Sequence, residues 1–450
     1  MLPRRRDIVT GLAAGAVLAL GRGTRRAEAA EVAALGTTLT PFGAIREGSS
    51  DGLLPAYGGT WLAPPAGAGA DPYAGEKPLF TIDSRNLDKH AARLSEGQKA
   101  LLRRYPQSFR MDIYPSHRDF RFADGILANL RLNARSAALT PDGEGVTGVF
   151  GAPAFPLPKS GLEAIWNAIT IARPVTARGT MDEAVVYPDG KIAWGAQKWD
   201  IYCPSYDPAV GRERFDGTSV VLYRTTTKPD REAGTIALAR EYWDFGRRPT
   251  QAWAYVPGTR RVKQVAEIAG DYPVGPGGFH TVDDTGLWAQ SPRCYDWELA
   301  GRREMFIPYH NNRLDDPGLP YKTLLGRAHL NPELTRWELH RCWVLKARIK
   351  PGIRHIYGAR TLYLDEDSLI PVLSDLHDMQ GRLYRVALNT SVYDAGAQLY
   401  APRLCVYHDL DSGAYMVDRL TNEVTDRMRI NEGGRSLSDY TPQQLQRKAV

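Results

Sequence analysis

The feature that most constrains this chain is a long series of short segments in which apolar and polar residues alternate, from about residue 183 onward. The clearest of these segments are 219–223, 235–242, 252–256 and 343–349. Such alternation, bounded by turn residues, is typical of strands with one buried face. The stretches between the segments are too short for the helical crossovers that parallel strands require. The pattern therefore predicts a large, mostly antiparallel sheet.

Helices are predicted only in the earlier part of the chain. Residues 83–104 have helical character, with Asp83 placed to cap a first helix and Ser95 and Gln98 forming a capping box for a second. Another capping box starts at Ser160. The residues that follow it form one apolar stripe at helical spacing, namely Leu162, Ile165, Trp166 and Ile169. We expect this last helix to pack on the apolar face of the sheet.

Strand 339–349 shows what that face contains. Alternate positions are apolar or aromatic, namely Leu339, Trp343, Leu345, Ala347 and Ile349. A face of this kind covers either a packed core or an apolar cavity, and the pattern alone does not decide between the two.

The prolines at 153, 156 and 158 exclude a helix just before residue 160 and favour a stiff, extended segment.

The first 29 residues have the order of an export signal. Arginines at 4–6 are followed by an uncharged, mostly small or apolar run over 8–20 and by the small-x-small sequence that ends at Ala29. Cleavage is predicted between Ala29 and Ala30. The paired arginines fit the twin-arginine form. The apolar run is shorter than the ~20 residues of a membrane-spanning helix. We expect a periplasmic protein that is soluble after export.

Composition adds limits on partners and redox state. Removing residues 1–29 takes away six arginines and two acidic residues, so the formal charge falls from +6 to +2, which does not favour nucleic acid. No cysteine lies near Ala29, so no N-terminal lipid anchor is predicted. The cysteines form no CxxC pair, and they leave either buried thiols or disulfides of unassigned pairing. They are Cys203, Cys294, Cys342 and Cys405.

Several long blocks together resemble an exported family of Gram-negative bacteria known as domain of unknown function 1329. The blocks occur in order through the predicted mature chain: LTPFGA (39–44), GEKPLF (75–80), LSEGQKALL (94–102), FRM (109–111), KSGLEAIWN (159–167), QAWAY (251–255), HLNP (329–332) and RHIY (354–357). On this basis the chain is identified as a member of that family over nearly its whole mature length.

Two further blocks resemble the wider LolA/LolB-like group of lipoprotein-sorting proteins. They are residues 253–262 and the pair 364–371 and 378–382. The resemblance implies an incomplete antiparallel β-barrel over 83–450, with early helices covering its open mouth. It also implies binding of lipid or acyl chains, and association with an inner-membrane exporter and an outer-membrane protein. Residues 30–82, rich in glycine and proline, are then an extended arm laid over this domain.

A search for chemistry finds no strong catalytic signature. The sequence contains no HExxH and no phosphate-binding loop ending in GK[ST]. The acidic run 365–367 lacks the spacing of a calcium loop and is interpreted as a solvated turn. Neither a cofactor nor a metal ion is predicted.

These observations favour a periplasmic carrier or accessory protein that binds a hydrophobic, lipid-like molecule and serves an envelope transport system. The candidate ligand-binding residues are Trp166, Trp253, Tyr255, Arg260 and Arg261. The two tryptophans are expected beside the cavity, although ordinary core packing explains them equally well. Two alternatives stay open: a periplasmic hydrolase acting on lipid or glycan, and a structural partner of an envelope complex.

Overall fold

The computed structural model describes residues 32–62, 70–266 and 268–448, and these are dominated by one sheet of 16 strands. Its strands are β1 Phe80–Ile82, β2 Met111–Ile113, β5 Thr176–Val186, β6 Ile192–Tyr202, β7 Thr218–Lys228, β8 Ile236–Tyr242, β9 Gln251–Val256, β10 Arg261–Val265, β13 Tyr295–Pro308, β14 Arg336–Ile349, β15 Ala359–Asp365, β16 Pro371–His377, β17 Leu383–Asp394, β18 Leu399–Asp409, β19 Tyr415–Leu420 and β20 Arg429–Ile430. Two small hairpins lie apart from it, β3 Ala138–Leu139 with β4 Val146–Thr147, and β11 Pro273–Val274 with β12 His280–Thr281.

The sheet confirms the predicted fold class. Its order is β1-β2-β14-β15-β16-β17-β18-β19-β5-β6-β7-β8-β9-β10, with β13 beside β14 and β20 beside β5. Strands from β5 onward pair antiparallel, and one short parallel pair joins β14 to the early strand β2. In the described residues β1 and β10 end the order without pairing to each other, so the sheet is not closed into a barrel.

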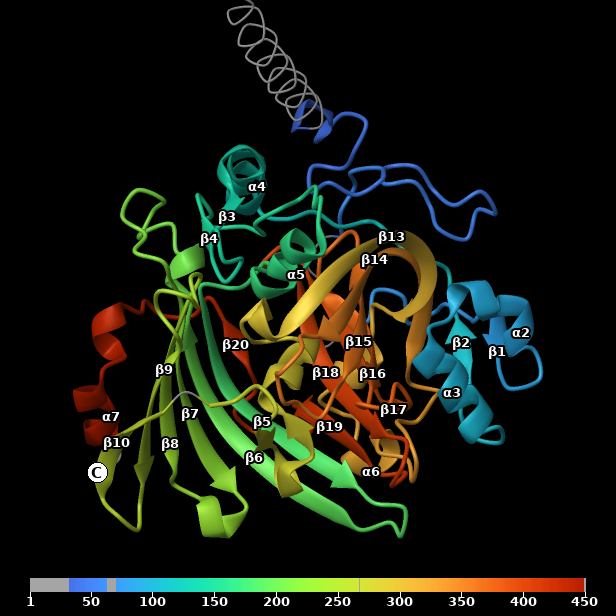
Figure 1. Cartoon of the computed structure of the whole chain (residues 1–450). Helices are drawn as coiled ribbons and strands as arrows, with labels where there is room; N and C mark the ends of the chain where they lie inside the picture. The colour runs from blue at the N-terminus through green and yellow to red at the C-terminus, as the bar shows by residue number, and fades with distance from the viewer. Residues whose placement is uncertain (1–31, 63–69, 267, 449–450) are drawn as a thin grey trace, which may run out of the picture.

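Few helices accompany this sheet (Figure 1). They are α2 Leu87–His90, α3 Glu96–Arg104, α4 Asp124–Ser136, α5 Gly161–Ile169, α6 Tyr321–Leu324 and α7 Pro442–Lys448. Helix α5 lies against β13 and β14, whereas α7 lies beside β8, β9 and β10 at the other end of the sheet. In the described part of the chain, no helix has both the length and the apolar character needed to cross a membrane.

The capping residues explain where the predicted helices begin. The Ser95 hydroxyl accepts from the Gln98 backbone N–H, and the Gln98 side chain accepts from the Ser95 N–H, as the sequence predicts. Ser160 accepts from the Glu163 N–H, but the Glu163 carboxylate accepts from Lys159 instead of Ser160.

The proposed cap at Asp83 is wrong, because its carboxylate accepts from Arg85 and α2 starts only at Leu87. Helix α4 escaped prediction. Its N-cap is Ala123, which has no side-chain oxygen to signal a helix start.

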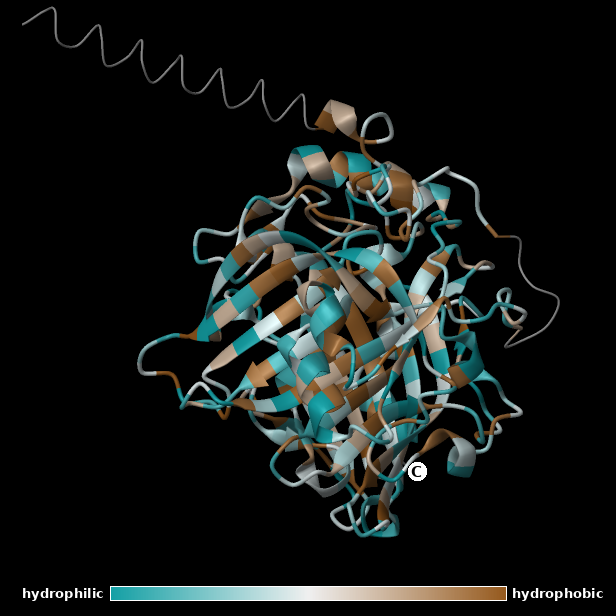
Figure 2. Ribbon diagram, turned by 90° about the vertical axis from the view of Figure 1, so that its right-hand side faces the viewer, coloured by the Kyte–Doolittle hydropathy of each residue, from teal (hydrophilic) through white to brown (hydrophobic). Residues whose placement is uncertain are grey.

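The central strands β5 and β7 pack against apolar clusters on both faces. Val185 and Val220 point toward α5 and belong to apolar clusters that contain its residues, whereas the adjacent Ala184 and Val221 belong to clusters on the opposite side. We name these sides the α5 face and the α7 face. Figure 2 shows the matching alternation of hydrophobic and hydrophilic residues along the strands. The alternation read from the sequence therefore reflects two cores, one on each side of the sheet.

Residues of the arm 30–82 pack into the core, and the cysteines form no disulfide among the described residues. Phe42, Leu54 and Tyr57 of the arm are buried in the largest apolar cluster, and Arg118 binds the arm through the Ile45 carbonyl at 2.9 Å. All four cysteines are free thiols, three of them buried and Cys294 half-buried. Ala29 and Ala30, the predicted cleavage site, lie outside the described residues.

Candidate ligand-binding site

Five apolar side chains form a row across the α5 face of strands β6 to β10. Strand register sets them opposite one another from strand to strand, as Ile201, Leu222, Ala239, Ala252 and Val265. All five are half-buried. In contrast, the positions of β16, in the other half of the strand order, are buried. We name this set the apolar row. Its partial exposure leaves apolar surface for a ligand to cover.

A second row on the same face carries positive charge. It runs beside the apolar row as Trp199, Arg224, Ala237, Ala254 and Lys263, and we name it the charged row. The Arg224 guanidinium lies 5.9 Å from the centre of the Trp199 ring. Among the described residues Arg224 forms no hydrogen bond and no ion pair. Glu183 attracts this guanidinium without forming a hydrogen bond or an ion pair with it, so its N–H groups remain suited to receive an anion.

One end of the apolar row meets a packed aromatic cluster. Ile201 and Leu222 pack against the group that contains Trp166 and Trp243. Trp166 is fully buried, its indole N–H donates to the Gly143 carbonyl at 3.0 Å, and its ring stacks 5.7 Å from that of Phe245. Trp166 is therefore a wall at the end of the row and not an exposed contact.

The part of β5 and β6 beyond the charged row is polar. Gln197 donates to the Glu183 carboxylate at 2.8 Å. Burial, followed by the nearby Asp418 carboxylate, raises the pKa of Glu183 to about 8. At neutral pH this group is therefore mostly protonated, and it does not repel an anion bound near Arg224.

The structure separates the five residues chosen from the sequence. Trp166 and Arg261 lie on the α5 side, with Arg261 exposed and paired opposite Val256. Trp253 and Tyr255 lie on the α7 face, where they pack with Tyr440 and Leu445 of the C-terminal segment. Arg260 occupies the exposed turn between β9 and β10 with φ of 52°.

Their role in binding stays a prediction. Sequence reasoning missed Trp199 and Arg224. The alternation indicates that each residue belongs to a strand, but it does not indicate which face of that strand is turned toward α5.

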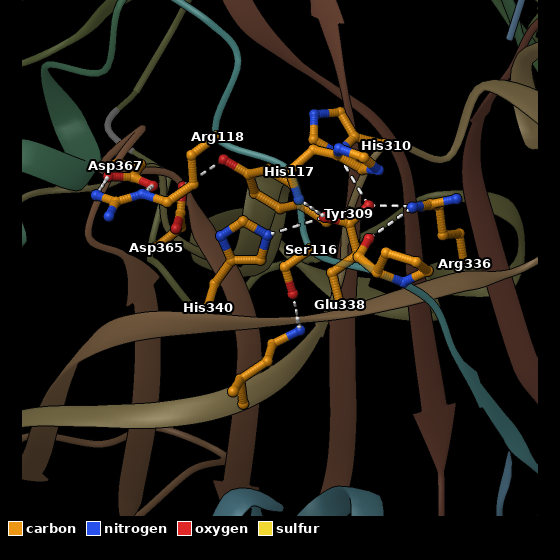
Figure 3. A network of polar contacts seen from close by, with 12 residues as sticks. Ser116, His117, Arg118, Tyr309, His310, Arg336, Glu338, His340, Asp365 and Asp367 are labelled. Carbon is orange, nitrogen blue, oxygen red and sulfur yellow. Dashed lines mark hydrogen bonds and ion pairs between the residues drawn. The ribbon is translucent and has the colours of Figure 1, made fainter. Parts of the chain in front are cut away.

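A buried network of polar groups lies in the other half of the sheet (Figure 3). Glu338 of β14 is at its centre. Its Oε1 accepts from Arg336 and contacts His310 Nδ1 at 2.9 Å, and its Oε2 contacts His340 Nε2 at 3.2 Å. Burial alone would raise the pKa of Glu338, but the two histidines and Arg336 hold it well below its usual range. This carboxylate is therefore a fixed charge that its surroundings stabilise.

The acidic turn after β15 corrects a prediction. Asp365, Glu366 and Asp367 are buried, not solvated. Asp367 is held by Arg118, with Nη2 to Oδ1 at 2.6 Å and Nε to Oδ2 at 2.8 Å. Burial raises the pKa of Glu366 to about 7 despite its ion pair with Arg302. The interpretation as a solvated turn fails because partner arginines come from segments distant in sequence.

Three groups beside this turn could hold a metal ion. Ligand atoms of His340, Asp365 and Asp367 lie within 4.8 Å of one another, and Asp365 Oδ1 has no hydrogen-bond partner among the described residues. A cation there would have to share Asp367 with Arg118, whose guanidinium already neutralises that carboxylate. We therefore assign these groups to the packing of the turn and not to a metal centre.

A second ionic cluster is buried on the α5 face. Arg360 of β15 is completely buried and donates from Nη1 to Asp284 at 2.8 Å and from Nη2 to Asp283. Its Nε donates to the Tyr295 hydroxyl at 3.2 Å. Burial would raise the pKa of Asp283, but Arg360 lowers it to about 2. Like the Glu338 network, this cluster consists of satisfied charges inside a packed core.

Comparisons with known proteins give the context of the chain. A family model described as "Protein of unknown function (DUF1329)" matches residues 81–446. A protein of Pseudomonas aeruginosa described as "Uncharacterized protein PA3922" is 35% identical in an alignment 438 residues long that covers 93% of this chain and 93% of its own.

Two solved structures are also similar. A DUF1329 family protein from Desulfovibrio piger has 14% identity and a TM-score of 0.40, over 60% of this chain and 92% of its own. LolA superfamily protein NE2245 from Nitrosomonas europaea has 14% identity and a TM-score of 0.35, over 63% of this chain and 98% of its own. With TM-scores this low, the function of the present chain has to be argued from its own residues.

Proposed function

The chain belongs to the family described as protein of unknown function DUF1329, and we propose that it is a binding protein for an amphipathic, lipid-like molecule. The ligand lies on the α5 face of β6 to β10, with its apolar part along the apolar row and its anionic part at Arg224. The observation that carries this proposal is the position of a half-buried, unpaired guanidinium directly beside a continuous apolar row.

The two rows complement the two parts of an amphipathic ligand. Covering half-exposed apolar surface stabilises a complex by ~25 cal/mol per Å². Arg224 and Lys263 add attraction for an anion, and Trp199 offers a flat ring beside the guanidinium. Specificity for a charged head group then comes from the charged row, and affinity for the chain from the apolar row.

The test for the apolar row is titration with a fluorescent fatty acid. Ala252→Trp fills the face of β9 and should weaken binding about tenfold, equivalent to ~1.4 kcal/mol. The matched control is Gln251→Trp, because Gln251 is the preceding residue of β9 and lies on the α7 face. Equal effects of both variants, or absence of binding to the folded wild type, would overturn the proposal.

The test for the charged row compares two probes of the same chain length. Arg224→Gln should weaken binding of a fatty acid about tenfold and leave a fatty alcohol unaffected, since only the acid carries charge. The exposed Arg178 of β5 lies on the α7 face and serves as control in an Arg178→Gln variant. An equal loss for acid and alcohol would show that Arg224 acts by packing alone.

We also propose that the protein acts in the periplasm and exchanges its ligand with an envelope transport system. The support is the twin-arginine sequence at residues 4–9 and the resemblance of 253–262 to lipoprotein-sorting proteins. Arg5→Lys with Arg6→Lys keeps the charge and should leave the precursor in the cytoplasm. Native mass spectrometry of protein from its own periplasm then distinguishes a bound lipid from a bound protein partner.

A further inference from the structure

A groove of about 760 Å³ opens far from the apolar row, where the chain after α3 meets segment 322–333. The turns at 188 and 412–413 close its sides. Four of its lining residues are cationic, namely Arg104, Arg110, Lys322 and Arg327, and one, Glu333, is acidic. A volume of this size accommodates a small organic molecule.

Lys322 and Arg327, two of the four cations of this groove, have no carboxylate partner among the described residues. Arg110 pairs with Asp112 at 3.3 Å and Glu333 at 3.4 Å. Within the described part of the chain, Arg327 donates to the Pro188 carbonyl alone, at 3.0 Å. Lys322 is exposed and forms no ion pair among the described residues. The groove therefore favours a molecule with an anionic group.

A serine and a histidine are hydrogen-bonded in the wall of the groove. Ser108 is exposed, His329 is buried, and the distance from Ser108 Oγ to His329 Nε2 is 2.9 Å. His329 Nδ1 lies 2.7 Å from the Leu330 carbonyl oxygen. A carbonyl oxygen can only accept, so Nδ1 carries the proton and Nε2 accepts from the serine hydroxyl. This tautomer is the one that a general base for a serine nucleophile requires.

The surroundings hold the histidine in that position and charge state. The Phe109 ring lies 5.2 Å and the Tyr105 ring 5.6 Å from the imidazole centre. A Cβ on Gly326 would lie 2.4 Å from the His329 carbonyl oxygen, so only glycine allows the chain to pass so closely. Burial lowers the pKa of His329, which keeps the imidazole neutral at pH 7.

We propose that Ser108 and His329 form the nucleophile and base of a second, hydrolytic site that cleaves esters bearing an anionic group. Ser108 Oγ attacks the ester carbonyl carbon while its proton passes to His329 Nε2. The intermediate collapses, and the leaving alcohol takes that proton. Water, deprotonated by His329 Nε2, then attacks the acyl carbon. The bond from that carbon to Ser108 Oγ breaks, His329 returns the proton to Oγ, and the acid leaves. Arg327 and Lys322 bind the anionic end of the substrate.

This activity is independent of ligand binding on the α5 face, so each can fail without the other. The first test is labelling of the full-length folded protein with a fluorophosphonate probe, read by intact mass and peptide mapping. One adduct on Ser108 is expected. Ser412→Ala is the matched control, because Ser412 lines the same groove but donates its hydroxyl to Asp409 at 3.0 Å. That variant should label like the wild type, whereas Ser108→Ala should not label.

The second test measures hydrolysis of two chromogenic esters, p-nitrophenyl hemisuccinate and neutral p-nitrophenyl butyrate. Ser108→Ala should lower kcat/KM for the hemisuccinate at least about 10²-fold with unchanged circular dichroism. Arg327→Gln should reduce the preference for the anionic ester over the neutral one. An unlabelled wild type, an adduct elsewhere in the chain, or wild-type turnover by Ser108→Ala would each overturn the proposal.

Discussion

Strands β15 to β18 and strands β6 to β9 belong to one sheet, but they differ in how their faces are covered. In β16 every residue from Pro371 to Leu376 is buried, so both faces are packed. In β6 and β8 most positions on the α5 face are half-buried. The first region encloses charges and satisfies them, as Arg360 of β15 shows, and Glu338 of the adjacent strand β14 is satisfied in the same way. The second leaves apolar and cationic groups at the surface.

This contrast indicates a division of labour within a continuous sheet. Stability is concentrated where both faces are covered, because most apolar surface is buried there and because breaking a buried ion pair is costly. Binding is assigned to the α5 face of β6 to β9, because α5 lies against β13 and β14 and does not cover these strands. Four predictions test this division, in order of decreasing effect.

The largest effect is expected in the packed region, from Arg360→Met. Removing the guanidinium takes away the cation that Asp283 and Asp284 share and leaves Asp283, among the described residues, with His355 alone as an ion-pair partner, which should lower the free energy of unfolding by roughly 5 kcal/mol. Urea unfolding followed by tryptophan fluorescence measures it. Arg231→Met, an exposed arginine that pairs with Glu232, should leave the midpoint unchanged. A loss below ~1 kcal/mol for Arg360→Met would show that this half tolerates buried charge.

Two tryptophans on the α5 side give the next comparison. Trp166→Ala opens a cavity in a packed cluster and should lower the free energy of unfolding by roughly 3–4 kcal/mol. Trp199 is only half-buried, so Trp199→Ala should lower it by at most about 1 kcal/mol and reduce fatty-acid binding instead. Equal stability losses would place Trp199 in a closed core and remove the contrast between the two regions.

Glu183 gives a pH-dependent test of smaller size. Its pKa rises from 4.5 to about 8 on folding, so folding takes up a proton between these values. The associated stability is complete below pH 4.5 and is lost as the pH rises through about 8. Thermal unfolding of Glu183→Gln should therefore depend less on pH over this range, and the variant should exceed the wild type at pH 8.5. The exposed Glu232→Gln should follow the wild type; a parallel profile for Glu183→Gln would contradict the assignment.

The smallest effect concerns the turn between β9 and β10. Arg260 has φ of 52°, a conformation that glycine adopts without strain, so Arg260→Gly should stabilise the protein by up to about 1 kcal/mol. Arg261 starts β10, where glycine weakens a strand. Arg261→Gly should therefore have the opposite sign in the same thermal melt. Two changes of the same sign would exclude a backbone origin.

The sequence predicts the local parts of this fold well. Alternation reveals the antiparallel strands, and Ser95 with Gln98 locates the start of α3, because both signals arise from neighbouring residues. The pairing of β19 with β5 joins distant segments and leaves no such local signal. The sequence also gives no signal for which face of a strand is turned toward α5, so Trp253 and Trp199 could not be distinguished in advance.

The sites depend on contacts between distant segments, which local patterns do not reveal. The turn at 365–367 was interpreted as solvated because Arg118 and Arg302 are remote in sequence. Ser108 and His329 are more than 200 residues apart in the sequence, and neither has a neighbouring motif that marks it as reactive. A serine next to an aromatic residue and a histidine before an apolar one are too common to single out.

The pairing of β5 with β19 also governs how the protein is made. Met416 is opposite Val185, so the centre of the sheet forms only after nearly the whole chain has left the ribosome. Until then β5 and β18 expose unpaired backbone edges, which invite association with other chains. Folding dominated by such distant pairings is slow. Synthesis therefore includes an interval in which these edges are exposed, and a chain truncated before residue 415 would keep β5 without its partner β19.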